Sequence, residues 1–207
     1  MYSAGTNGAS GYFDGSGDAL STSSMTVNGT GNFTLEFWAY MTSTSGNRTF
    51  ATFNDTSNAN NILQYYVRNG EFKLYSNAGG VRTFSGGYAP ENQWAFIHLS
   101  RSGSTATLKV NNVSYGTVSS SENLNGVLGI GAYVNQSIGD PYKGYICDYR
   151  VSNTIRSSAI PTEPLGTDSN TKLLLNMDDG QAIDSAAQNN LTLYGNAKIS
   201  TGQAKFG

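Results

Sequence analysis

The sequence predicts an all-β protein, built as an antiparallel β-sandwich. Apolar and polar residues alternate with a period of two in many segments, as they do in half-buried strands. Convincing helical periodicity is missing from the whole sequence. Glycines stand at the ends of the alternating segments and the four prolines lie in connections, where turns need them. Short strands separated by turn residues are typical of a sandwich.

The clearest predicted strand is FTLEFWAYM, residues 33–41. One of its faces is apolar and carries Phe33, Leu35, Phe37, Ala39 and Met41. The opposite face carries Thr34, Glu36, Trp38 and Tyr40. We therefore expect a half-buried antiparallel strand whose second face is partly aromatic.

Three pairs of strands follow along the chain. NILQYYV and EFKLYS are joined at Arg68-Asn69-Gly70, which is a signal for a tight hairpin. WAFIHLSRSG and STATLKV form a second predicted hairpin around Ser102-Gly103. VLGIGAYV and YKGYICDYRVS are predicted to form a third pair across the polar loop from Asn135 to Pro141.

The C-terminal segment, residues 171–207, contains two late strands, TKLLLNM and NLTLYG. A linker-like stretch at 161–170, PTEPLGTDSN, separates it from a main body at 1–160. The segment has too few apolar residues to build a core alone. It therefore either docks on the main body or belongs to a neighbouring subunit.

The composition limits the partners of this chain. Of its 207 residues, 38% are hydrophobic and 13% are charged, which is about half of the usual ~25%. The net charge is −2 and no basic stripe is visible, which argues against nucleic acid. No apolar run approaches the ~18 residues of a membrane span, so no membrane insertion is expected. A surface of Ser, Thr, Asn, Gly and Tyr suits neutral hydrogen-bonding partners such as sugars, and also inert structural proteins.

Catalytic residues are hard to find in this sequence. Cys147 and His98 both lie in alternating strand patterns, so we interpret them as packed core residues. Glycoside hydrolysis needs two carboxylates, whereas Glu36, Glu71 and Asp148 lie singly on separate strands. The sequence therefore predicts a protein that is not an enzyme, although a carboxylate pair from different strands stays open.

Four segments in the right order resemble the laminin-G-like, concanavalin A-like lectin/glucanase jelly-roll family. They cover roughly residues 10–157 and read GYFDGSGDALSTSS, GNFTLEFWAYMTST, NQWAFIHLSRSGSTATLKVNNV and GYICDYRVSNTIR. Polar versions of the family resemble domains of bacteriophage tail and surface proteins. The resemblance implies a non-enzymatic module on a virion, or otherwise extracellular, that binds host surface glycans or other virion proteins, as a monomer or a homo-oligomer. Two alternatives stay open, a purely structural capsid decoration or tail connector without a small ligand, and a glycan hydrolase.

The order of the segments differs from that of the family. A segment like residues 171–207 usually comes first there, directly before one like GYFDGSGDAL. The chain therefore looks permuted relative to the family, or it exchanges strands with a neighbour. We expect the segment to complete the sandwich of its own chain.

A calcium site is predicted at Asp14 and Asp18, in the glycine-rich loop FDGSGD. The family often holds calcium between strand ends with an acidic residue near the last strand, and that residue here is Asp148. Further carboxylates for such a site are Asp178, Asp179 and Asp184. Ordinary turn chemistry is the alternative interpretation of the loop.

A glycan site is predicted on loops rich in tyrosine. Tyr88 lies in GGYAPENQ, and Tyr133 and Tyr142 flank VNQSIGDP, which contains Asn135 and Asp140. Aromatic rings can stack on the C–H groups of a sugar while amides and carboxylates bind its hydroxyls. The alternative is that these tyrosines only pack loops onto the sandwich.

Overall fold

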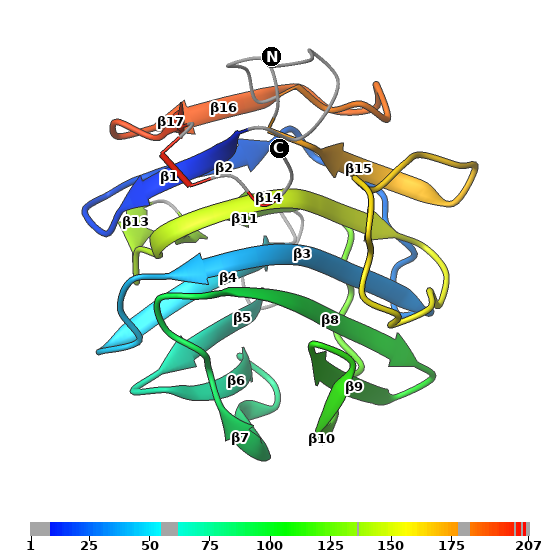
Figure 1. Ribbon diagram of the computed structural model, residues 1–207. Coiled ribbons are helices and arrows are strands. Elements are labelled where there is room, and N and C mark those ends of the chain that lie inside the picture. Colours follow the sequence, from blue (N-terminus) through cyan, green and yellow to red (C-terminus); the bar gives the residue numbers. More distant parts are fainter. Residues whose placement is uncertain are drawn as a thin grey trace.

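The computed structural model describes residues 9–54, 62–135, 137–177, 183–200, 202–203 and 205 (Figure 1). Within these ranges all regular secondary structure is β-strand. Two antiparallel sheets pack face to face. This confirms the predicted fold class. In the same ranges we find no helix with the length and apolar character of a membrane span.

The eight-stranded sheet contains both the N-terminal strand and the strand nearest the C-terminus. Its strands, in spatial order, are β10 (Val113–Ser119), β9 (Thr105–Val110), β8 (Trp94–Ser102), β3 (Phe33–Met41), β14 (Lys143–Ser152), β1 (Ser10–Asp14) and β17 (Lys198–Ser200). The eighth strand, β15 (Thr171–Leu175), also pairs with β14.

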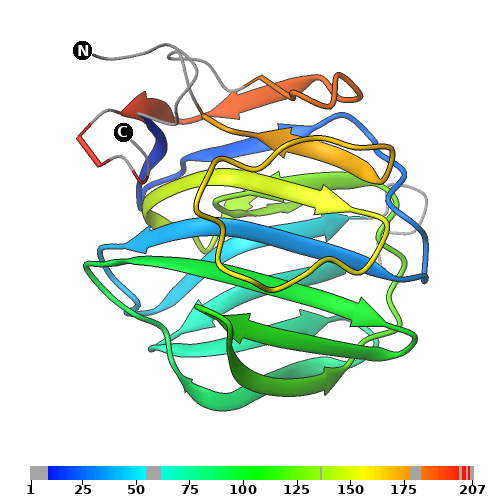
Figure 2. The same cartoon turned by 45° about the vertical axis from the view of Figure 1, so that its right-hand side comes forward.

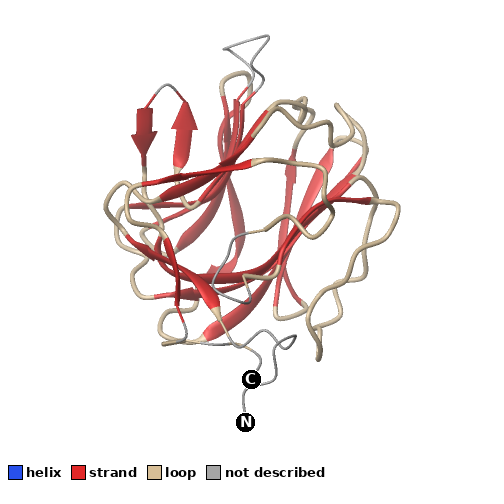
Figure 3. Ribbon diagram, turned by 90° about the horizontal axis from the view of Figure 1, so that it is seen from above, coloured by secondary structure: helices blue, strands red, loops and turns tan. Residues whose placement is uncertain are grey.

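The seven-stranded sheet covers the other side of the core. Its order is β16 (Leu191–Tyr194), β2 (Ala19–Thr22), β11 (Val127–Ile130), β4 (Asn47–Asn54), β5 (Ile62–Arg68), β6 (Glu71–Ser76) and β7 (Gly80–Tyr88). A separate hairpin of β12 (Tyr133–Asn135) and β13 (Ser137–Gly139) stands out from the sandwich (Figure 3).

The core between the sheets is rich in aromatic rings. The predicted inner face of β3 is confirmed, because all five of its side chains are at most 1% exposed. Phe50 lies at the centre, with ring centroids 5.2 Å from both Phe37 and Tyr65. Such ring pairs stabilise the core beyond their buried area.

The outer face of β3 is more buried than the alternation predicts. Glu36 is 1% exposed and Trp38 is 4% exposed, and only Tyr40 is half-buried. The reason is that residues 153–170 run across this face of the eight-stranded sheet (Figure 2). Under this segment, Glu36 forms a salt bridge of 2.7 Å with Arg150.

His98 and Cys147 are buried, as their strand patterns predict. The Nε2 of His98 lies 3.2 Å from the carbonyl oxygen of Arg156. Because a carbonyl only accepts, this nitrogen carries the proton, and burial lowers the pKa of the imidazole. Burial raises the pKa of the Cys147 thiol, which therefore stays protonated.

Two predicted hairpins are confirmed, because β5 pairs with β6 and β8 pairs with β9, and one predicted strand pair is wrong. Arg68 pairs with Glu71 across Asn69 and Gly70, whose φ angles of 50° and 85° are those of a tight primed turn. In contrast, β11 pairs with β2 and β4, whereas β14 lies in the other sheet. The chain between them forms the β12–β13 hairpin and then crosses to the opposite sheet, so β11 and β14 face each other across the core.

The C-terminal segment completes both sheets of its own chain. Leu175 pairs with Tyr149 in β14, and Ile199 pairs with Gly11 in β1. In the other sheet, β16 pairs with β2 along its whole length. Figure 1 shows these late strands beside the first strands of the chain. The expected completion is therefore seen within one chain, while the boundary at 161–170 stays a prediction.

Candidate functional site

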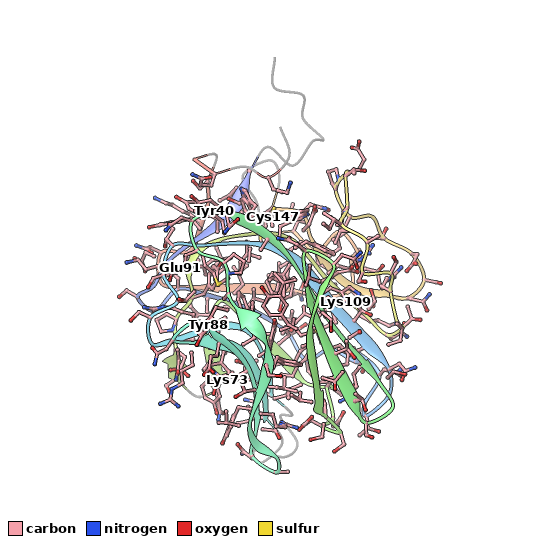
Figure 4. The ribbon with its side chains drawn as sticks, turned by 60° about the horizontal axis from the view of Figure 1, so that its bottom comes forward. Tyr40, Lys73, Tyr88, Glu91, Lys109 and Cys147 are labelled. Atoms are coloured by element: carbon pink, nitrogen blue, oxygen red, sulfur yellow. The ribbon has the colours of Figure 1, made fainter. Side chains whose placement is uncertain are left out.

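The outer face of the seven-stranded sheet, from β4 to β7, is the surface that we call the front face. The strand register places on it, among others, the side chains of Asn47, Thr49, Thr52, Gln64, Tyr66, Arg68, Glu71, Lys73, Tyr75, Val81 and Thr83. Residues that alternate with these, such as Tyr65 and Phe72, point into the core. Figure 4 labels Lys73 and Tyr88 on this side of the molecule.

The β12–β13 hairpin lies beside the front face. Val134 packs on Gly129, where an added Cβ would lie 2.5 Å from a Val134 methyl group, so glycine leaves the room that the hairpin needs. Tyr133 and Asn135 alternate with Val134 and point away from this contact. Both are half-buried, and Asn135 Oδ1 accepts a hydrogen bond of 3.2 Å from Asn54 Nδ2.

Asp140 fixes the base of the hairpin to the front face. Its Oδ1 accepts from Asn47 Nδ2 at 3.1 Å, and its Oδ2 accepts from Gln64 Nε2 at 3.0 Å. Its carbonyl oxygen also accepts from the backbone N–H of Thr49 at 3.1 Å. Asp140 therefore holds the amide groups of Asn47 and Gln64 in fixed positions on the front face.

Two tyrosines lie in the middle of the front face. Tyr66 is 4% exposed, and burial raises the pKa of its phenol, with Asp140 and Tyr75 adding to the rise and Arg68 opposing it. The Tyr66 phenol is therefore protonated and able to donate a hydrogen bond. Tyr75 is half-buried, and its hydroxyl donates to Asn77 Oδ1 at 2.9 Å.

The charges of the front face are mostly engaged. Lys73 Nζ lies 2.9 Å from Glu71 Oε2 and also donates to Thr83 Oγ1 at 2.9 Å. The Asp140 carboxylate accepts amide hydrogens on both oxygens. Glu71 and Asp140, the carboxylates found on the described part of this face, are thus held by other side chains, and the surface suits a neutral polyhydroxylated ligand.

The structure brings together three of the five predicted glycan-binding residues, namely Tyr133, Asn135 and Asp140. Tyr88 is 70% exposed at the far edge of the same face, where it pairs with Glu71. Tyr142 is fully buried and its ring packs against Phe50 at 5.4 Å, because the chain enters the core after Pro141. This corrects the predicted position of Tyr142 on the rim.

The predicted calcium ligands are divided between two places. Asp14 and Asp18 lie together, with the backbone N–H of Asp14 donating to Asp18 Oδ2 at 2.8 Å. Asp148 instead accepts from Asn176 Nδ2 at 2.6 Å, on the far part of β14. Among the described residues, no group of three His, Cys, Asp or Glu side chains is arranged to hold a metal.

The other carboxylates predicted to bind calcium add no ligand to the pair of Asp14 and Asp18. Asp178 and Asp179 lie outside the described residues. Asp184 accepts from the backbone N–H groups of Leu174, Ala186, Gln188 and Asn189 and from Asn189 Nδ2. It therefore caps its own loop.

Asn196 is the third side chain at the Asp14–Asp18 loop, and the sequence did not point to it. With Nδ2 turned inward, its amide donates to Asp18 Oδ1 at 2.7 Å and to Asp14 Oδ2 at 3.3 Å. With Oδ1 turned inward, the same three side chains present only oxygens to one another. Such a set of hard oxygen atoms fits Ca²⁺.

The sequence also did not predict a row of aromatic rings on the eight-stranded sheet. Tyr12, Tyr145, Tyr40 and Trp94 are cross-strand neighbours, with successive centroid distances of 5.0, 6.0 and 5.7 Å. All four are half-buried. Cross-strand aromatic pairs stabilise a sheet, which accounts for this row without a ligand.

The two sheets and their polar, aromatic front face define a jelly-roll sandwich of the lectin-like class. The family model of the concanavalin A-like lectin/glucanases superfamily matches residues 14–159. The chain belongs to this family. A comparison with curated protein sequences found no match.

Solved structures with the same fold have little sequence identity to this chain. A candidate carbohydrate-binding protein from Bacteroides ovatus is 15% identical, with a TM-score of 0.72, and the match covers 96% of this chain and 61% of that one. This chain thus spans less than two thirds of that protein. The heptameric SAP-like pentraxin of Limulus polyphemus is 11% identical, with a TM-score of 0.62 and coverage of 89% and 94%. The CBM40 domain of a Ruminococcus gnavus sialidase, bound to sialyllactose, is 15% identical, with a TM-score of 0.51 and coverage of 68% and 91%.

Proposed function

We propose that this protein is a non-enzymatic carbohydrate-binding module, and that the front face and the β12–β13 hairpin bind an oligosaccharide. The observation that carries the proposal is that each half-buried ring has an amide beside it, Tyr75 opposite Gln64 on the sheet and Tyr133 two residues from Asn135 on the hairpin. The rings offer faces for sugar C–H groups, while Gln64 Oε1 offers an acceptor and Asn135 Nδ2 a donor for hydroxyls, because Gln64 Nε2 and Asn135 Oδ1 are engaged within the protein.

The solved structures support this proposal by their ligand class. The proteins from Bacteroides ovatus and Ruminococcus gnavus are described as carbohydrate-binding, and they share the fold. Because one fold hosts many functions, the main support for glycan binding is the chemistry of the front face. A virion location, virion partners and a homo-oligomer remain expectations from the family resemblance, and the proposal does not depend on them.

Binding without hydrolysis follows from the state of the carboxylates. A glycosidase needs one carboxyl to donate a proton and a second to act as base or nucleophile. On the front face, Glu71 is paired with Lys73, and Asp140 is held by Asn47 and Gln64. Neither carboxyl is placed as a free proton donor, so bound glycans should be recovered intact.

Replacing Tyr75 and Tyr133 with alanine should weaken glycan binding about tenfold or more, because each ring supplies a stacking surface at the centre of the site. A glycan array with the native protein identifies the ligand. Titration calorimetry then measures its Kd for the native protein and for each variant.

Tyr194→Ala is the matched control, because Tyr194 is a partly exposed tyrosine on β16, away from the front face. It should leave the Kd unchanged. The proposal fails if no glycan binds on the array. It also fails if binding survives both front-face variants but is lost in Tyr40→Ala, which would move the site to the aromatic row of the other sheet.

For the loop of Asp14 and Asp18 we propose Ca²⁺, held by these two carboxylates and by Asn196 Oδ1. The ion would join the first strand to the C-terminal segment. A ligand present at about 100 times its Kd stabilises a protein by about 2.7 kcal/mol. For a chain of this length, this corresponds to a rise in Tm of about 5–10 °C.

The expected result is that a calcium chelator lowers the Tm by that amount and that Asp18→Asn removes the effect. Asp168→Asn serves as the control, because Asp168 pairs with Arg156 on another part of the surface. Equal melting curves with calcium and with chelator would show that Asn196 Nδ2 alone joins the two carboxylates.

A further inference from the structure

A polar cavity of about 500 Å³ lies at the end of the sandwich opposite the hairpin. It is lined by Asn28, Asn125, Asn153, Lys172, Gln188 and Asn189, over a floor that includes Met25 and Val27. The strand β14 runs from Lys143, near the hairpin, to Ser152, beside this cavity. None of the described residues that line the cavity belongs to the front face or to the β12–β13 hairpin, so the two sites are formed by different side chains.

The chemistry of the walls differs from that of the front face. Among the described residues that line the cavity, none is acidic or aromatic, and Lys172 is the one that carries a formal charge. Five of the lining side chains are amides, which can donate and accept hydrogen bonds. A ligand for such walls is polar, rich in hydroxyls and negatively charged.

The walls are held in place by polar side chains that bind backbone N–H groups. The loop of Gln188 and Asn189 is fixed by Asp184, whose carboxylate accepts from both of their backbone N–H groups, at 3.1 and 3.0 Å. On the other side, Asn125 Oδ1 accepts from the backbone N–H groups of Val27 and Gly29, each at 3.0 Å. A pre-formed site loses less entropy when it binds a ligand.

Two polar groups in the cavity walls have no ion-pair or hydrogen-bond partner in the described part of the chain. A ligand could supply both partners. The ammonium group of Lys172 makes no ion pair or hydrogen bond with the described part of the chain. Asn153 Oδ1 is buried and has no hydrogen-bond partner there. A buried acceptor without a donor costs free energy, which a ligand hydroxyl would recover.

We propose that this cavity binds a carboxylated sugar, such as a hexuronate or a sialate at the end of a glycan. The carboxylate of the sugar would pair with Lys172, and a hydroxyl would donate to Asn153 Oδ1. The remaining hydroxyls would contact the amides of Asn28 and Gln188. A simple carboxylate lacks the hydroxyls, and a neutral sugar lacks the charge, so neither satisfies both wall groups.

This site depends on the C-terminal segment. Lys172, Gln188 and Asn189 lie outside residues 14–159, the range that the family model matches. The other walls come from residues 24–29, 125 and 153, so four distant parts of the chain meet here. The inference does not rest on glycan binding at the front face.

The test is a calorimetric titration of the full chain with glucuronate, N-acetylneuraminate, glucose and acetate. At least one of the two acidic sugars should bind about tenfold more tightly than glucose and acetate. Lys172→Met, which removes the charge and keeps most of the length of the side chain, should remove that preference. Gln188→Glu should also remove it, because it places a negative charge in an exposed part of the wall. Two acidic sugars in parallel distinguish a hexuronate from a sialate.

Lys143→Met is the matched control, because Lys143 is an exposed lysine at the other end of β14, and it should keep the preference. Tyr75→Ala should keep it too, which separates this site from the front face. The proposal is overturned if neither acidic sugar binds, if glucose or acetate binds equally well, or if both Lys172→Met and Gln188→Glu keep the preference.

Discussion

Replacing Arg101 with methionine is expected to lower the free energy of unfolding by about 3–5 kcal/mol. The guanidinium is fully buried and lies 5.1 Å from the centre of the Phe33 ring. It donates to the carbonyl oxygens of Gly29 at 3.1 Å, of Gly31 at 3.1 and 2.8 Å, and of Glu122 at 2.7 Å. One side chain therefore ties two loops to β8.

The size of the effect follows from the partners that would remain. A buried charge can often be replaced by apolar residues when its partner is replaced with it. Here the partners are backbone carbonyls, which no substitution removes, so methionine would leave buried acceptors without a donor. Burial lowers the pKa of Arg101, with the Glu122 charge opposing this, and the guanidinium still stays protonated.

Urea unfolding of the native protein and of Arg101→Met measures this difference. Arg68→Met is the control, because Arg68 is exposed on the front face, and it should change stability by less than about 0.5 kcal/mol. An Arg101→Met variant within about 1 kcal/mol of the native protein would contradict the assignment of Arg101 as the anchor of both loops.

The sequence predicts best those parts of the fold that depend on neighbours along the chain. The Asn69-Gly70 hairpin needs only positive φ angles at two adjacent positions, and these residue types supply them. The inner face of β3 needs only alternation. The pairing of β11 and β14 could not be predicted, because both strands are buried on most positions and their patterns fit either sheet.

For the candidate sites too, the sequence does not predict contacts between residues that are far apart along the chain. Tyr142 follows a proline in a polar loop, which is typical of a surface residue, yet its ring fills the core beside Phe50. Asn196 reaches the loop of Asp18 only because β16 pairs with β2. The acidic-sugar cavity needs the C-terminal segment to dock beside residues 24–29. Each of these contacts joins residues far apart in the sequence, and local pattern carries no information about it.

Removing residues 171–207 is expected to abolish cooperative folding. Leu173, Leu175 and Met177 are at most 1% exposed, and their burial contributes about 5–9 kcal/mol at 1.5–3 kcal/mol each. This is comparable to the whole stability of a typical domain, about 5–15 kcal/mol. The truncation would also leave β1 and β2 with an open edge, which favours aggregation.

A permuted chain is the matched control, because it keeps every residue. It would begin at Glu163, pass from Gly207 through a short glycine-serine linker to Met1, and end at Thr162, both new ends being exposed. Ser10 Oγ donates to the carbonyl oxygen of Gln203 at 2.6 Å, so the joined parts already lie side by side. Circular dichroism melting should show a cooperative transition near that of the native protein for the permuted chain and none for the truncated one. A truncated chain that melts cooperatively near the Tm of the native protein would contradict this prediction. It would mean that the sandwich folds without the C-terminal strands.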